Sequence, residues 1–279
     1  RNTGIAESNG EFIFFLDSDD WLSKNALSNL IKHVNLNPEL VVAPHNQYLS
    51  PSRIKKKSYL VCNNIKNFDK KSILNYVLNY LHLPYEYVMF VHCWNKLYSS
   101  KIIKENRILF EVKLSQLEDV NFNFKYLKFV NKISYSNTFD YFHNIENKSN
   151  SASGLAGSEK SSVEKCELAF SSVKDYLEFD KDLSESKKLK LLAHHFASTA
   201  IIYLIRMTRA FIKKPSISKY NNIKKWIKSS QLITNINYYK VQKGESHLIK
   251  IVIKIGSTSL FICICFFRIQ FLKLRALIK

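Results

Sequence analysis

The sequence predicts an α/β protein followed by an α-helical C-terminal region, and three observations lead to this prediction. The stretch 12–16 (FIFFL) is apolar without alternation, which is typical of a strand covered on both faces in a mainly parallel sheet. Segments with helical and strand-like periodicity then alternate up to about residue 143. Beyond the small polar residues 147–162 (NKSNSASGLAGSEKSS) only helical patterns follow. We therefore expect a boundary there, with domains over residues 1–148 and 149–279.

The individual elements follow from local patterns along the chain. A turn or helix end over residues 1–10 precedes the first strand. Residues 69–81 carry an apolar stripe at helical spacing, as do residues 117–129, whereas the basic stretch 50–57 (SPSRIKKK) reads as a loop. We expect further helices over 22–33, 100–106, 163–179, 185–212, 216–230 and 246–277, and further strands over 40–43, 59–61, 88–98 and 133–143.

Composition limits the class of protein. The 279 residues are 46% hydrophobic and 13% aromatic, with only six Gly and five Pro, so the chain can build a sizeable core and is not a low-complexity protein. The five cysteines include no C-x-x-C pair. This usage indicates reduced, structural thiols in a cytosolic setting.

Three carboxylates follow the first strand, at Asp17, Asp19 and Asp20. Asp17 and Asp19 are two positions apart, so their side chains point the same way in extended backbone. Two hard oxygen ligands of this kind can hold a divalent cation together with substrate phosphates. In the alternative interpretation Asp19 or Asp20 is the N-cap of the helix expected at 22–33. Both roles are compatible, because different aspartates can serve each.

A second carboxylate pair, Glu118 and Asp119, stands at the start of the helix expected at 117–129. The helix dipole alone would stabilise such a pair. The functional hypothesis is a general base at a cleft, with the neighbouring carboxylate tuning its proton affinity.

Positive charge is concentrated in the second half of the chain. The net charge is +19, and from Lys187 onward 19 basic residues face a single acid, Glu245. Such a segment implies an anionic partner. Basic residues alternate there with long apolar runs, which favours an anionic membrane surface over nucleic acid. The 13 uncharged residues between Lys254 and Arg268 are too few to span a bilayer, which takes ~20. A helical subdomain with a solvated basic face is the alternative.

Three motifs together resemble the family-2 glycosyltransferases with the GT-A (Rossmann-like) fold, enzymes of bacterial surface-polysaccharide and lipopolysaccharide synthesis. The first runs from Arg1-Asn2-Thr3-Gly4-Ile5 through GEFIFFLDSDDWL at 10–22. The second is WNKLY at 94–98, and the third is EDVNF at 118–122. Their order and spacing agree with the family over about residues 1–150. The basic tail resembles the variable C-terminal extensions of such enzymes without a specific motif.

The resemblance implies a role for each matching residue. Asp17 and Asp19 match the D-x-D motif, which holds Mn²⁺ or Mg²⁺ against the diphosphate of a nucleotide-sugar, most simply a UDP-sugar; Arg1 and Asn2 match a segment near the donor. Asp119 matches the catalytic base of an inverting transfer to a glycan or glycolipid acceptor, and Glu118 would orient the acceptor or the base. In the family a further stretch lines the cleft, and it matches Trp94, Asn95 and Lys96 of this sequence. The setting implied is cytoplasmic, peripheral at the inner face of the cytoplasmic membrane.

Two departures from the family pattern qualify the resemblance. His143 stands where an aromatic residue is usual and is either a third metal ligand or a histidine at a strand end. The family's opening strand–helix–strand units have no counterpart, so roughly 60–90 residues are missing at ~30 residues per unit. We therefore also expect an unpaired edge at 12–16. The alternative to a glycosyltransferase is an inactive fragment acting only as a membrane-associated or interaction module.

Overall fold

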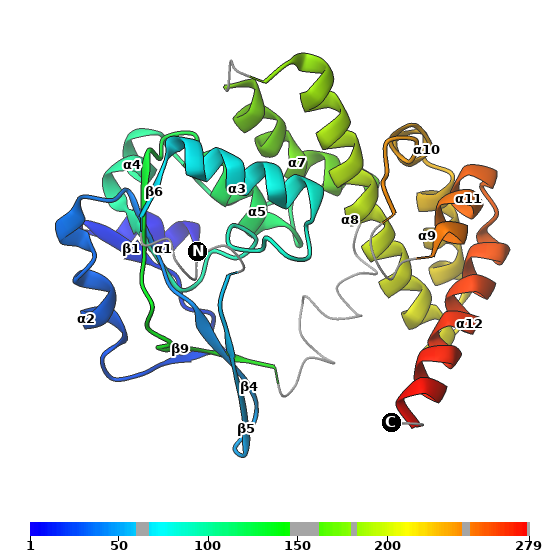
Figure 1. The fold of residues 1–279 in the computed structure, drawn as a ribbon, viewed down its shortest axis with the longest axis horizontal. Helices are drawn as coiled ribbons and strands as arrows, with labels where there is room; N and C mark the ends of the chain where they lie inside the picture. The colour runs from blue at the N-terminus through cyan, green and yellow to red at the C-terminus, as the bar shows by residue number, and fades with distance from the viewer. Residues whose placement is uncertain (60–66, 146–161, 180–182, 242–245, 278–279) are drawn as a thin grey trace. The chain divides into compact units, whose positions relative to one another are not determined.

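The computed structural model describes residues 1–59, 67–145, 162–179, 183–241 and 246–277 and is drawn in Figure 1. The chain divides into two compact units. The first comprises Arg1–Lys148 and Ala169–Asp182, and the second Ser149–Leu168 and Leu183–Lys279. The residues around the predicted boundary, 146–161, lie outside the described part of the chain. Segment Ala169–Asp182, expected in the second domain, packs with the first unit.

A five-stranded sheet forms the centre of the first unit. Its order is β1 (Phe12–Phe14), β7 (Lys96–Ser99), β3 (Leu40–Val42), β8 (Lys132–Tyr135) and β6 (Asn67–Asp69). Only β3 and β8 run parallel, while the other three pairs are antiparallel. The prediction of a mainly parallel sheet is therefore wrong for the described strands. The apolar run reports burial and carries no information on strand direction. Leu16 at its end is in fact 48% exposed.

A second sheet of four strands adjoins the carboxylate segment after β1. Its order is β2 (Trp21–Leu22), β9 (Tyr141–Asn144), β4 (His45–Ser50) and β5 (Arg53–Lys57). The stretch 50–57 that was expected as a loop thus closes a hairpin, which Figure 1 shows projecting from the first unit. All five residues of β5 are exposed. Such a polar strand has no hydrophobic alternation that sequence reasoning could detect, and its lysines suit a sheet edge.

In the described part of the first unit the helices are α1 (Asn2–Glu7), α2 (Ala26–Ile31), α3 (Lys70–His82), α4 (Ser100–Glu105), α5 (Glu118–Leu127) and part of α7 (Val163–Glu178). A 3₁₀ turn, η1 (Val34–Leu36), follows α2. Helix α3 begins as expected, because the Asp69 carboxylate caps it by accepting a hydrogen bond from Ser72 N at 2.9 Å. Helix α2 starts later than predicted, at an N-cap residue Asn25. The hypothesis that Asp19 or Asp20 caps a helix over 22–33 is therefore wrong.

Two predicted strands are shorter than expected. Only Lys96–Ser99 of the stretch 88–98 is a strand, and 133–143 separates into β8 and β9, which belong to different sheets. Most of the strand expected at 59–61 lies outside the described residues. The turn between β8 and β9 carries the chain from the central sheet to the second one, next to the candidate site.

Aromatic rings fill the core beneath the carboxylate segment. Phe15 packs edge-on against Tyr98, Phe110 and Phe122, with centroid distances of 5.3–5.5 Å. Phe110 and Phe122 stack with their centroids 4.2 Å apart and 7° between planes. These rings fix the end of β1 against α5, so that residues far apart in sequence meet at one place.

The second unit is helical, with α8 (Glu185–Lys213), α9 (Ile217–Ile227), α10 (Ser230–Asn235), α11 (His247–Ile255) and α12 (Thr258–Leu277). The single helix expected over 246–277 is broken at Gly256, whose φ of +73° ends α11 in the left-handed conformation. Among the described residues, no helix combines the length and the apolar character needed to cross a bilayer.

Candidate active site

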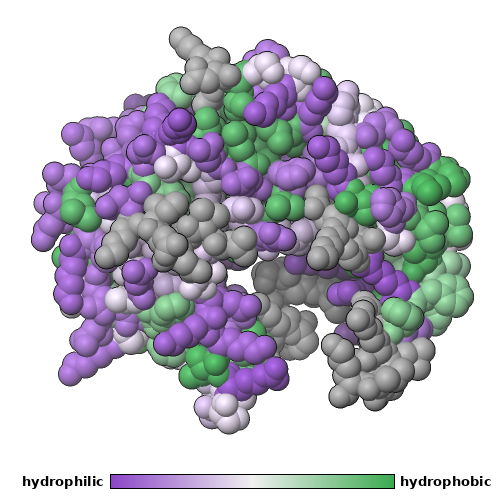
Figure 2. Space-filling view, in the orientation of Figure 1, coloured by the Kyte–Doolittle hydropathy of each residue, from purple (hydrophilic) through white to green (hydrophobic). Residues whose placement is uncertain are grey.

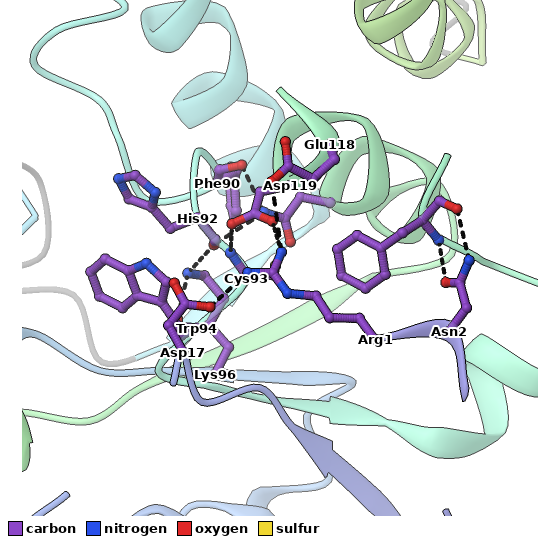
Figure 3. Close-up of polar contacts among 12 residues, drawn as sticks. Arg1, Asn2, Asp17, Phe90, His92, Cys93, Trp94, Lys96, Glu118 and Asp119 are labelled. Atoms are coloured by element: carbon purple, nitrogen blue, oxygen red, sulfur yellow. Dashed lines mark hydrogen bonds and ion pairs between the residues drawn. The ribbon is translucent and has the colours of Figure 1, made fainter. Parts of the chain in front are cut away.

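Three segments bring charged side chains together in the first unit, as Figure 3 shows: the start of α1, the turn after β1 and the first turn of α5. Asp17 follows β1, Glu118 and Asp119 begin α5, and Arg1 precedes α1. The loop leading into β7 lies beside them with its backbone at Cys93. The structure thus joins both carboxylate motifs that the sequence singled out.

The Arg1 guanidinium bridges the two motifs. Its Nη2 donates to Asp17 Oδ1 at 2.6 Å, its Nη1 contacts Asp119 Oδ1, and Glu118 Oε1 lies 4.0 Å from Nη1. The guanidinium lies over the Phe110 ring, with Cζ 5.2 Å from the ring centroid. Burial alone lowers the pKa of Arg1, but the negative charges of Asp119 and Asp17 outweigh it and the pKa is raised. Arg1 is thus a permanent cation between the carboxylates.

Asp119 is held through both of its carboxylate oxygens. Oδ1 contacts Arg1, and Oδ2 accepts a hydrogen bond from Cys93 N at 3.1 Å. The Cys93 thiol lies 3.6 Å from Arg1 Nη1 and is buried. Burial, together with the Asp119 charge, raises the pKa of this thiol well above its usual range. The thiol is therefore protonated at neutral pH, and Arg1 together with the Cys93 backbone amide holds Asp119 in place.

Two carboxylates beside Arg1, those of Asp17 and Glu118, have raised pKa values. Burial raises the pKa of Asp17, against the opposing effect of Arg1, and burial with the neighbouring Asp119 charge raises the pKa of Glu118. Asp20 accepts hydrogen bonds from Tyr141 Oη at 2.5 Å and from Asn144 N at 2.8 Å. Asp20 therefore joins the carboxylate segment to β9, a role that sequence reasoning did not assign to it.

Asn95 and Lys96, expected to line a cleft, are instead internal. The Asn95 amide donates to the carbonyls of Ala43 and Pro44, both at 2.9 Å. Lys96 is fully buried, and its Nζ donates to the carbonyls of His92 at 2.6 Å and Trp94 at 3.3 Å. Burial lowers the pKa of Lys96 to about 8. Both side chains brace the loop that presents Cys93 N to Asp119.

Trp94 is buried in an aromatic stack beside the same loop. It stacks between His92 and Tyr141, with centroid distances of 4.9 and 4.8 Å, and contacts His45 and His143 at 4.9 and 5.1 Å. Asn2 is likewise structural, because its amide exchanges two 2.9 Å hydrogen bonds with the Phe110 backbone. These contacts fix the positions of Arg1 and of the loop that leads into β7.

The carboxylates suit a hard divalent cation. Asp19 is exposed beside Asp17, and two carboxylates with substrate phosphates are the donor set that Mg²⁺ takes. Within the described ranges, however, no group of three or more His, Cys, Asp or Glu side chains is placed to hold a metal ion. His143, expected as a possible third ligand, packs against Trp94 and His45.

Sequence reasoning missed Cys93 and Tyr141. Cys93 acts through its backbone amide, which leaves no side-chain signature in the sequence. Tyr141 donates to Asp20 across 121 residues, and only the pairing of β9 with β2 brings the two together. Arg1 was expected near the donor, and in the structure it contacts Asp119, the residue expected to be the base.

Comparisons with known proteins identify the class. Residues 1–107 match the model of glycosyl transferase family 2. The candidate glycosyltransferase EpsH of Bacillus subtilis is 26% identical over 147 residues, 52% of this chain and 40% of its own length. The poly(ribitol-phosphate) β-N-acetylglucosaminyltransferase TarP of Staphylococcus aureus is 27% identical over 146 residues, with the same coverage. The poly(ribitol-phosphate) β-glucosyltransferase of Bacillus spizizenii is 25% identical over 195 residues, 69% of this chain and 27% of its own length.

Solved structures agree on the fold. TarS of S. aureus (residues 1–349, in complex with UDP-GlcNAc) superposes with a TM-score of 0.58 at 16% identity, covering 96% of this chain and 70% of TarS 1–349. The expected resemblance is therefore confirmed over residues 1–107, which match glycosyl transferase family 2, and the chain shares the GT-A fold of TarS, including a helical region after it. The chain spans two fifths or less of the length of the curated relatives it matches.

Proposed function

We propose that this protein transfers a sugar from a nucleotide-sugar to an acceptor in bacterial cell-surface glycan synthesis, with inversion at the anomeric carbon. The observation that carries the proposal is the convergence of Asp17, Glu118 and Asp119 on Arg1. The family match of residues 1–107 and the glycosyltransferase names of the relatives support it.

Asp119 is the candidate general base. Its side chain is largely buried, and Arg1 and Cys93 N fix its orientation, which is the preorganisation that proton transfer requires. It would take the proton from the acceptor hydroxyl as that oxygen attacks the anomeric carbon. Glu118, one residue earlier on α5, would orient the acceptor hydroxyl. A single displacement of this kind needs no covalent intermediate.

Asp17 and Asp19 would hold Mn²⁺ or Mg²⁺, which would offset negative charge on the departing diphosphate. Asp17 Oδ1 accepts a hydrogen bond from Arg1, so a metal ion bound by Asp17 would compete with Arg1 for the same oxygen. Asp19 is exposed and is the more accessible of the two carboxylates.

For the substrates, the relatives favour a UDP-sugar donor and a surface-polymer acceptor. TarS was crystallised with UDP-GlcNAc and with UDP. Two curated relatives act on poly(ribitol-phosphate), by their names. Glycan and glycolipid acceptors belong to the same proposal, because all offer a hydroxyl near the membrane.

We place this activity at the cytoplasmic face of the membrane, held there by α11 and α12. Figure 2 shows hydrophobic side chains gathered over these helices. The residues concerned include Leu248, Ile251, Ile255, Phe267 and Phe271, all exposed, with Phe267 at 70%. Residues 248–279 hold six basic residues and no acid. An apolar stripe flanked by cations fits shallow insertion into an anionic leaflet.

The proposal is tested with protein from the complete natural reading frame, by measuring UDP release from UDP-GlcNAc and other UDP-sugars. We expect turnover that EDTA abolishes and Mn²⁺ or Mg²⁺ restores. Asp119→Asn should lower the rate by about 10²–10⁴-fold while UDP still binds. Asp140→Asn is the matched control, because Asp140 is an aspartate of the same unit bound to Ser23 and Asn29. A normal rate for Asp119→Asn would transfer the base role to Glu118, and no turnover with any UDP-sugar would refute the proposal.

A further inference from the structure

One face of the second sheet carries a row of side chains that begins beside the carboxylates and ends in two lysines. In the strand pairing Tyr141 lies opposite His45, which lies opposite Lys57, and His143 lies opposite Gln47, which lies opposite Lys55. Residues directly opposite each other share a sheet face. We call this side of the sheet the lysine face; its members Tyr141 and His45 are buried, His143 and Gln47 are half-buried, and Lys55 and Lys57 are exposed.

The lysine face is continuous with the candidate active site. The Tyr141 hydroxyl donates to Asp20 Oδ2 at 2.5 Å and lies 3.4 Å from Asp17 N. Trp94 stacks on Tyr141 and contacts His143, and Trp94 follows Cys93, whose amide binds Asp119. Because Trp94, Tyr141 and His45 are buried, a ligand that extends from the base toward the lysines would contact the half-buried His143 and Gln47 on the way.

The two lysines of this face have no acidic residue near them in the sequence. No Asp or Glu occurs between Glu39 and Asp69 in the sequence. Lys55 and Lys57 are exposed and form no ion pair with the described residues. Burial is the largest cause of the low pKa of about 3 at His45, followed by two neighbouring histidines, Lys96 and then Lys57, so this histidine is neutral. Two like charges on adjacent positions of one face repel, and an anion placed between them would relieve that repulsion.

Lysines on an edge strand also discourage sheet-to-sheet pairing. That explanation gives both faces of β5 the same role and predicts no ligand. The neighbouring lysine, Lys56, projects from the opposite face, where it lies over the Phe139 ring at 5.2 Å. The strand therefore contains its own control residue.

We propose that the lysine face binds the phosphate groups of an anionic acceptor chain whose reacting hydroxyl lies at Asp119. The proposal rests on the transferase function given above and deepens it by naming the acceptor chemistry. Charge complementarity and continuity with the carboxylate cluster support it. Lysine ammonium groups bind phosphate as point charges, which suits a flexible polymer with regularly spaced phosphates better than one rigid ligand.

The test measures binding of poly(ribitol phosphate) by calorimetry at low salt, with wild-type protein, Lys55→Gln/Lys57→Gln and Lys56→Gln. We expect the double substitution to weaken binding about tenfold or more and to flatten its salt dependence, since two phosphate contacts are lost. Lys56→Gln, which removes a charge one position away, should change the dissociation constant less than about twofold. Circular dichroism confirms that the variants are folded.

Several outcomes would overturn the proposal. These are absence of polymer binding by wild-type protein, a loss of binding in Lys56→Gln as large as in the double variant, or unchanged binding by the double variant. A matching loss of UDP affinity would assign the lysines to the donor, and a matching loss of binding to anionic vesicles would assign them to the membrane. Polymer binding that depends on the lysine face, without UDP-sugar turnover by wild-type protein, would instead refute the transferase function alone.

Discussion

Replacing Asn95 by alanine tests whether this residue is structural, as its contacts indicate. Asn95 is 2% exposed, has a φ of +58° and donates to two buried carbonyls, Ala43 O and Pro44 O. Each carbonyl left without a donor costs about 1–3 kcal/mol. Alanine also lacks the polar side chain that helps asparagine adopt the left-handed backbone conformation, which adds about 1 kcal/mol. We expect Asn95→Ala to lower the free energy of unfolding by about 3–7 kcal/mol.

The assay is urea unfolding followed by tryptophan fluorescence, with the midpoint compared at equal slope. Asn95→Gly is the matched variant, because it removes the same hydrogen bonds but accepts the positive φ. It should be less destabilised than Asn95→Ala by roughly 1 kcal/mol. The reasoning fails if Asn95→Ala unfolds within about 1 kcal/mol of wild type, or if the glycine variant is the less stable of the two.

Three further predictions follow from individual contacts. Lys96 has a pKa of about 8 in the folded protein against 10.5 in the unfolded chain. The unfolded chain therefore binds more protons between these pH values, and stability should rise with pH from 8 to 10.5. Urea midpoints should show that rise in wild type relative to Lys96→Met, and parallel curves for the two proteins would contradict it. Arg1→Gln frees Asp17 Oδ1 and should tighten Mn²⁺ binding about tenfold by electron paramagnetic resonance, whereas unchanged or weaker binding would show that Arg1 does not compete. Phe267→Ser/Phe271→Ser should abolish cosedimentation with anionic vesicles, and equal binding to neutral vesicles by wild type would remove the role of charge.

Local patterns were sufficient for several features of the fold and the site. The Asp69 cap and the apolar stripe of α3 are encoded within a few residues, so this helix was predictable. The motifs at Asp17–Asp19 and Glu118–Asp119 were likewise visible as carboxylates that a chain does not place beside buried segments without cause. The resemblance that they support is confirmed for residues 1–107.

Strand direction and the basic hairpin needed the tertiary structure. Hydrophobic periodicity records which residues are buried, but it does not record which strand lies alongside or in which direction. Strand β1 therefore read as a member of a parallel sheet, although it pairs antiparallel with β7. Strand β5 gave no signal because its five residues are all exposed.

The sequence by itself determined which carboxylates to consider, and it showed the resemblance to the family-2 glycosyltransferases that the family model matches over residues 1–107. Only the tertiary structure decided that Arg1 joins Asp17 to Asp119, which lies 118 residues from Arg1, and that Cys93 holds the base candidate through its backbone amide. The physical reason is that a side chain's charge is local information, readable at its position. Its partner is chosen by chain topology and packing, which bring distant segments together and leave no mark in the spacing of either one.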